Sequence, residues 1–139
     1  MAPAGVSDPS DIAILRTARG PVALPLLRIL VSGFASRHDL PVDRLDDLEL
    51  ALEVLLADEP EGDGELVLEI AAVSGGLRVR LDGLLNKNLK DALLTNDLFH
   101  PRRGCLLDVR MLLDSLLDDY RILDAGAHPF AVEMEKRAS

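Results

Sequence analysis

Alternation between apolar and more polar residues predicts two hairpins in this chain. Residues 66–71 alternate in this way, and residues 77–82 repeat the pattern after a turn at Ser74, Gly75 and Gly76. Two further alternating runs, at residues 120–123 and 130–134, are joined by a glycine-containing turn. A period of two is typical of strands with one buried face, so each pair predicts two antiparallel strands joined by a short connection.

Apolar spacings of three and four residues predict three helices. The first covers residues 21–37, and its Pro25 requires a start near Pro21 or later because proline is tolerated only in a first helical turn. A second helix is expected to begin with Asp43 as its N-cap and to end before Pro60. The third is expected over residues 104–117.

The order of these elements predicts an α+β fold. A short β-prone run at residues 12–15 adds a first strand, whereas residues 84–100 fit either a helix or an irregular segment. Consecutive strands joined by tight turns pair antiparallel, so we expect a two-layer sandwich: a mostly antiparallel sheet with helices on one face. We expect residues 11–137 to form a single domain and residues 1–10 to be a disordered leader.

Composition excludes several classes of function. The chain has 139 residues and a formal net charge of −9, which disfavours direct binding to nucleic acid because polyanion binding requires lysines and arginines. Cys105 is the only cysteine, so no intrachain disulfide can form, and the histidines show no metal-site spacing. Charges interrupt every apolar run before it reaches a bilayer-spanning length. We therefore expect a soluble, cytoplasmic protein without a metal site.

The negative charge is concentrated in one segment. Residues 39–69 contain twelve acids and one base, a local charge of −11, and the rest of the chain is close to neutral. This segment is either a solvated helix face, whose early acids suit the helix dipole, or a docking surface for a basic protein partner. In the second case we expect four carboxylates after the helix to bind the partner: Asp58, Glu59, Glu61 and Asp63.

The same region resembles a known family. Residues 45–57 are similar to the helix that carries the first ATP-site motif of the anti-sigma-factor serine kinases, which belong to the GHKL superfamily with histidine kinases and gyrase. Residues 17–28 resemble the family's strand exit and first helix, residues 110–116 its last helix, and residues 120–133 its closing hairpin. The resemblance implies the Bergerat fold, which is the histidine-kinase-type ATPase fold.

The resemblance also assigns roles to individual residues. Glu53 matches the family's catalytic base, but Ala57 stands where a magnesium-binding asparagine is expected one turn later. Asp82 matches the aspartate that binds adenine, followed by Gly83 and no second motif glycine. Gly104 is the single glycine of the phosphate-binding turn. Three of the ATP-site motifs are thus incomplete.

Each matching residue also has a structural explanation. Glu53 continues the acidic stripe begun by Glu49, Asp82 can begin a turn, and Gly104 can start a helix. We therefore expect an anti-sigma-factor-like regulatory protein that acts by protein binding, with a degenerate ATP site, no required cofactor and no kinase activity. The resemblance implies a sigma factor and an anti-sigma-factor antagonist as partners, and a homodimer.

The alternative is an active ATP-dependent serine-protein kinase of the same fold that uses ATP and magnesium. In that case Glu53 is the base, Asp82 binds adenine, and Arg102 or Arg103 replaces the lost phosphate contacts.

Overall fold

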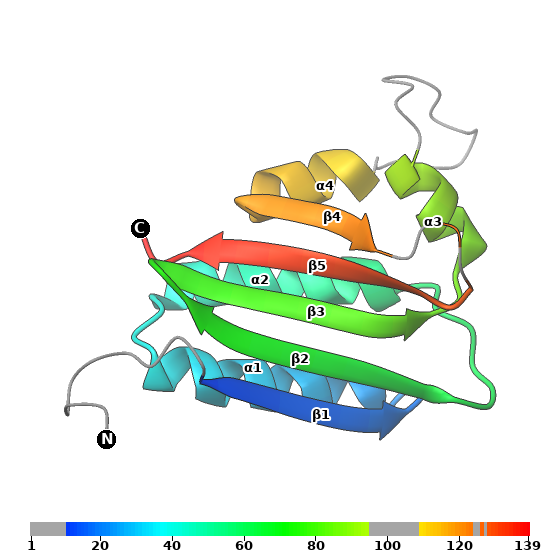
Figure 1. The fold of residues 1–139 in the computed structure, drawn as a ribbon, viewed down its shortest axis with the longest axis horizontal. Helices are drawn as coiled ribbons and strands as arrows, with labels where there is room; N and C mark the ends of the chain where they lie inside the picture. Colours follow the sequence, from blue (N-terminus) through cyan, green and yellow to red (C-terminus); the bar gives the residue numbers. More distant parts are fainter. Residues whose placement is uncertain (1–10, 95–108, 124–125, 127) are drawn as a thin grey trace.

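A computed structural model describes residues 11–94, 109–123, 126 and 128–139. The described strands form one antiparallel sheet in the order β1-β2-β3-β5-β4 (Figure 1). Their bounds are Ile12–Ala18 for β1, Glu65–Val73 for β2, Gly76–Leu84 for β3, Asp119–Leu123 for β4 and Phe130–Arg137 for β5. Strands β1 and β4 are therefore the two edges of the sheet.

The helices form a second layer on one face of the sheet. Helix α1 covers Ala23–Arg37 and α2 covers Val42–Leu56, and both cross behind the sheet in Figure 1. Two shorter helices lie beside β4: α3 at Lys87–Leu94 and α4 at Val109–Leu116. The α+β two-layer sandwich that the sequence predicts is confirmed.

Leucines from both layers fill the core between them. In β2 every second residue is buried, from Leu66 to Ala72, and faces the helices. Helix α2 contributes Leu48, Leu52 and Leu55, which are fully buried. Burying each such side chain stabilises the fold by about 1.5–3 kcal/mol, so the aliphatic composition supplies the core without aromatic residues at most positions.

One charged side chain is also buried between the layers. Lys136 of β5 points toward the helices, where its Nζ atom lies 3.1 Å from an Asp47 carboxylate oxygen and donates to the carbonyl oxygen of Leu116 at 2.6 Å. Leu116 is the last residue of α4, so the ammonium group interacts favourably with the negative end of that helix. Lys136 thereby links α2, α4 and β5.

Two expectations about helices need adjustment. Asp43 is not the N-cap of α2, because the helix begins at Val42 after Pro41 and has no side-chain cap; Asp43 lies in its first turn. The undecided segment contains α3, whose N-cap is Asn86: its Oδ1 atom accepts from the N–H groups of Asn88 and Leu89 at 3.1 and 3.2 Å. Asparagine is among the best N-caps, so the asparagines here start a helix.

Parts of two other expectations lie outside the described residues. The predicted helix at residues 104–117 is seen as α4 from Val109, and its first five residues are not described. The expected leader at residues 1–10 also lies outside the described residues.

No helix among the described residues is both long enough and apolar enough to cross a membrane.

Candidate functional site

The predicted catalytic glutamate lies on the outer surface of the helix layer. The Glu53 carboxylate pairs with Arg28 of α1 at 2.7 Å, and its side chain is 49% exposed. The buried residues of α2 point toward the sheet, whereas Glu53 points toward the neighbouring helix. In this arrangement the carboxylate neutralises a surface arginine.

The predicted adenine-binding aspartate lies on the opposite side of the molecule. Asp82 alternates with the fully buried Leu81, so its side chain projects from the face of the sheet that carries no helices. There its Oδ2 atom lies 3.3 Å from Arg80, and its Oδ1 atom accepts from the N–H of Gly83 at 2.9 Å. The sheet therefore separates Asp82 from Glu53, and the two carboxylates do not converge on one ligand.

Gly83 itself lies in a tight approach between strands. Its φ of +93° is a conformation that other residues rarely adopt, and an added Cβ atom would overlap the carbonyl oxygen of Glu65. The pairing of β3 with β5 shifts register at the same point. The glycine thus permits a bulge at the end of β3. Gly104, with Arg102 and Arg103, lies outside the described residues.

The backbone that follows Gly83 binds a carboxylate of the chain itself. Both carboxylate oxygens of Glu59 accept from the N–H of Leu85, at 3.0 and 3.1 Å, and one accepts from the N–H of Asn86 at 3.2 Å. Successive N–H groups that converge in this way form an anion-binding site. Here the anion is an internal side chain supplied by the connection between α2 and β2.

Arg19 completes this buried cluster from the end of β1. Its guanidinium group lies 2.5 Å from Glu59, donates to the carbonyl oxygen of Gly83, and donates to that of Asp63 at 3.3 Å. The side chains of Arg19 and Glu59 are only 3% and 5% exposed. Three strand ends and the turn after α2 are therefore held together by one ion pair.

This geometry corrects the expected docking surface. Glu59 does not contribute to an exposed surface, because its carboxylate is buried against Arg19 and two backbone N–H groups. Asp58, Glu61 and Asp63 are exposed, as a docking surface requires. The candidate surface is therefore reduced to these three residues.

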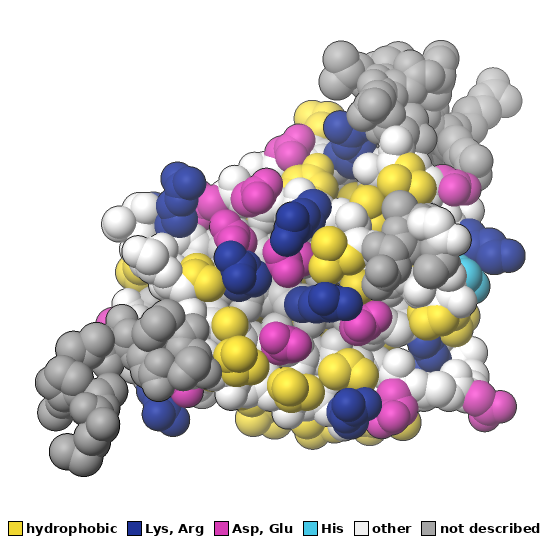
Figure 2. All heavy atoms as spheres, in the orientation of Figure 1, with side chains coloured by type: hydrophobic (Ala, Val, Ile, Leu, Met, Phe, Trp, Pro, Cys, Tyr) yellow, Lys and Arg dark blue, Asp and Glu magenta, His cyan; other side chains and the backbone are white. Residues whose placement is uncertain are grey.

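The open face of the sheet carries charges in a cross-strand pattern. Figure 2 shows this face, where basic and acidic side chains alternate across its middle. Arg78 lies 3.0 Å from Glu135, and Arg121 lies 2.8 Å from Glu133. Opposite charges on neighbouring strands stabilise a sheet modestly. Asp82 belongs to the same charged array, where it pairs with Arg80 of its own strand.

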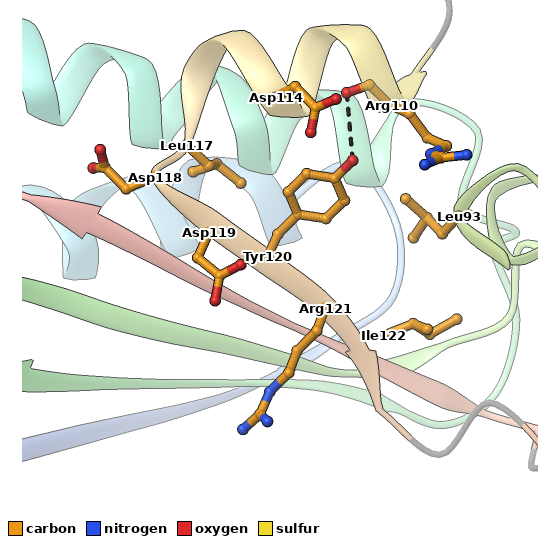
Figure 3. A pocket seen from close by; sticks show the side chains of 9 residues that line it. All are labelled: Leu93, Arg110, Asp114, Leu117, Asp118, Asp119, Tyr120, Arg121 and Ile122. Atoms are coloured by element: carbon orange, nitrogen blue, oxygen red, sulfur yellow. Dashed lines mark hydrogen bonds between the residues drawn. The ribbon is translucent and has the colours of Figure 1, made fainter. Parts of the chain in front are cut away.

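A cleft of about 470 Å³ lies between β4 and the two short helices (Figure 3). Tyr120 projects into it, and its hydroxyl group donates to the carbonyl oxygen of Arg110 at 3.4 Å. Burial raises the pKa of Tyr120, the nearby Asp114 carboxylate raises it further, and Arg110 acts in the opposite direction. Among the described residues, the cleft contains a phenol and carboxylates, and neither Asp82 nor Gly83 lines it.

The described residues contain no group of three or more histidines, cysteines, aspartates or glutamates that could hold a metal ion. Comparison with known proteins found no family model and no curated protein that matches the chain. The assignment of a function therefore depends on the geometry and on the resemblance described above.

Two residues of these environments, Arg19 and Tyr120, were not predicted from the sequence. Arg19 is the last charged residue before the Gly20-Pro21 turn, a position that gives no sign of burial. Tyr120 is the only tyrosine of the chain, which singles it out, but its neighbours in the cleft come from separate elements. The contacts of Arg19 are distant in sequence, whereas those of Tyr120 come mainly from α4, six to ten residues earlier.

Proposed function

We propose that this chain is a regulatory protein of the anti-sigma-factor type, which acts by binding a protein partner and has a degenerate ATP site. The resemblance rests on an order of elements, namely a strand, two helices, a hairpin, further helical structure and a second hairpin. The described elements follow the same order. This agreement supports the proposal at the level of the fold.

The observation that carries the proposal is the position of Glu59. In the proposed ancestral site, the backbone after the Asp82-Gly83 motif would approach the nucleotide. In this chain the N–H groups of Leu85 and Asn86 bind the Glu59 carboxylate instead. A nucleotide brought to the same place would find these N–H donors already occupied by the buried Glu59 carboxylate, which is itself paired with Arg19.

The groups that phosphoryl transfer would require are also missing or engaged elsewhere. Phosphoryl transfer requires a positioned base together with a magnesium ion that neutralises the phosphates. Glu53 is paired with Arg28, and Ala57 offers no ligand atom one turn later. A protein that regulates by binding needs neither group, which favours this function over the kinase.

The expected partners are a cytoplasmic sigma factor and an anti-sigma-factor antagonist. Asp58, Glu61 and Asp63 present three exposed carboxylates on the turn after α2. Such a cluster increases the association rate with a basic segment and disfavours acidic partners. We therefore assign partner binding to this turn.

The test measures binding between the purified chain and the sigma factors of its source organism by surface plasmon resonance. Reversing Asp58, Glu61 and Asp63 to lysine is expected to weaken capture of the partner at least tenfold, mainly through slower association. The control reverses three other exposed acids, Asp43, Asp46 and Asp119, so the net charge changes equally. Equal weakening by both triple variants would contradict the assigned turn, and capture of no sigma factor would contradict the partner class.

A further inference from the structure

The edge of the sheet formed by β4 borders the cleft. Among the described residues, β4 pairs with β5 on one side only, and α4 lies beside it (Figures 1 and 3). The cleft volume of about 470 Å³ is within the range of about 300–1,000 Å³ that is usual for ligand pockets. An unpaired strand next to a cleft offers a backbone template for another strand and room for its side chains.

The hydrogen bonds of β5 show which backbone groups of β4 are left for a further strand. The N–H of Ala138 donates to the carbonyl oxygen of Gly75 at 2.8 Å, in register with the pairing of β5 and β3. Bonding direction alternates along an antiparallel strand, so residues 131, 133 and 135 of β5 bond to β4 instead. Their partners in β4 are Asp119, Arg121 and Leu123. The N–H and C=O groups of Tyr120 and Ile122 therefore point away from β5.

The side chains of the same two residues line the cleft. Tyr120 and Ile122 pair with buried residues of β5, so they face the helix layer, and Figure 3 shows Tyr120 pointing toward α4. Leu93 of α3 and Leu117 add further apolar surface. Because successive side chains of a strand point to opposite faces, a strand added to β4 places every second side chain against this apolar wall.

Charge indicates which side chains fit the cleft. Three aspartates and two arginines line it, and one of the arginines, Arg121, pairs with Glu133 at 2.8 Å. The cleft therefore has an excess of negative charge. Asp114 is exposed, and its carboxylate lies near the Tyr120 hydroxyl group. A lysine or arginine can pack its aliphatic stem against the apolar wall and place its positive charge beside Asp114.

We infer that this cleft binds a basic, extended segment of another protein, which adds to β4 as an antiparallel strand. Directly opposite residues of an antiparallel pair have their side chains on the same face. The residues that exchange hydrogen bonds with Tyr120 and Ile122 are therefore the ones whose basic side chains enter the cleft. The inference stands independently of the proposed function, which assigns partner binding to the turn after α2.

Tyrosine fluorescence of the full chain tests this site, because Tyr120 is the only tyrosine and the chain has no tryptophan. The probe is a capped peptide of about eight residues in which lysine and threonine alternate, long enough to span the five residues of β4. We expect a saturable change in fluorescence. A peptide of the same composition with its lysines grouped at one end should bind about tenfold more weakly. Equal binding of the two peptides would indicate unspecific attraction to an acidic protein and overturn the inference.

Methylation of the peptide's backbone nitrogens tests the strand pairing. Methylated at its lysines, the peptide cannot donate hydrogen bonds to the carbonyl oxygens of Tyr120 and Ile122, so its affinity should fall about tenfold. Methylated at its threonines, it should keep its affinity, because those nitrogens face away from β4. The opposite result overturns the inference. Free lysine that binds as tightly as the peptide would assign the cleft to a small molecule and also overturn it.

Asp114→Asn tests the charge in the cleft. We expect this variant to bind the alternating peptide about tenfold more weakly, because it loses the charged partner of a lysine. Asp43→Asn is the matched control, since Asp43 is an exposed aspartate of α2 and the net charge changes equally. Equal affinities of the two variants would overturn the inference. Peptide binding that weakens as the protein concentration rises would assign the edge to a second copy and overturn it as well.

Discussion

Glu53 and Glu59 lie in the same acidic segment, yet the fold places them in opposite environments. Glu53 pairs with Arg28 on the surface of the helix layer, where both side chains are about half exposed. Glu59 pairs with Arg19 inside the molecule and also accepts from two backbone N–H groups. A run of like charges along the chain is therefore not one surface. Each acidic residue has its own role, which depends on how deeply it is buried and on which groups it contacts.

The different environments imply different energies. An exposed ion pair contributes about 0.2–1 kcal/mol, because water and salt screen it. In a buried pair, the removal of one charge leaves the other unpaired in a medium of low polarity, and this destabilises the fold strongly. The Arg19–Glu59 pair should therefore determine whether the strand ends and the turn after α2 stay together, whereas the Arg28–Glu53 pair should matter little.

The largest effect is expected for Glu59→Ala. Loss of the carboxylate removes the ion-pair partner of the buried Arg19 guanidinium and the acceptor of two N–H groups. The free energy of unfolding should therefore fall by about 3–5 kcal/mol. Urea denaturation followed by circular dichroism measures this change. The double variant Arg19→Met, Glu59→Leu removes both charges and should be more stable than Glu59→Ala alone. A loss below 1 kcal/mol in Glu59→Ala would show that the pair is not buried in solution.

A much smaller effect is expected for Glu53→Ala. Because the Arg28–Glu53 pair is exposed, its loss should lower the free energy of unfolding by at most about 1 kcal/mol. Raising the salt concentration should reduce the difference between the variant and the wild type. The same urea experiment in low and high salt measures both. A loss as large as that of Glu59→Ala would remove the contrast between the two glutamates.

The smallest effect is expected at Tyr120, whose surroundings are only partly buried. Burial and Asp114 raise the pKa of its phenol above the usual value of 10. The folded protein then favours the neutral phenol. The contribution of Tyr120 to the free energy of unfolding should therefore be fully present below pH 10 and be lost as the pH rises through the raised pKa. Tyr120 is the only tyrosine of the chain, so ultraviolet absorbance of the phenolate reports this group alone.

Asp114→Asn separates the two causes at Tyr120. The titration midpoint should move toward 10 but remain above it, because burial is the larger cause. The urea-unfolded chain supplies the reference titration. A native midpoint at or below that of the unfolded chain would contradict the placement of Tyr120 in the cleft.

Sequence patterns predicted most elements of the fold, because each of these elements has a regular spacing of apolar residues along the chain. The alternation in β2 and β3 arises from one buried face, and the spacing of leucines in α2 arises from its contact with the sheet. Asn86 was not assigned as a helix start, since the asparagines around it and Pro101 made an irregular segment as plausible as a helix, although leucines recur at helical spacing. Local capping by the asparagine side chain begins that helix instead.

The site could be predicted only in part. Alternation with Leu81 is visible in the sequence and already places Asp82 on the face away from the apolar side of β3. No local signal distinguishes Glu59 from Asp58 or Glu61, because its burial depends on Arg19, forty residues earlier in the chain. Contacts between distant segments therefore decided which acid became structural and which stayed exposed.

Isothermal titration of the full chain with ATP and magnesium tests most directly whether the ATP site is degenerate. Because Glu59 occupies the N–H groups after Gly83, we predict no saturable binding up to about 1 mM nucleotide, a limit that corresponds to about −4 kcal/mol. Saturable, magnesium-dependent binding that is lost in Asp82→Asn and retained in the control Asp119→Asn would contradict it.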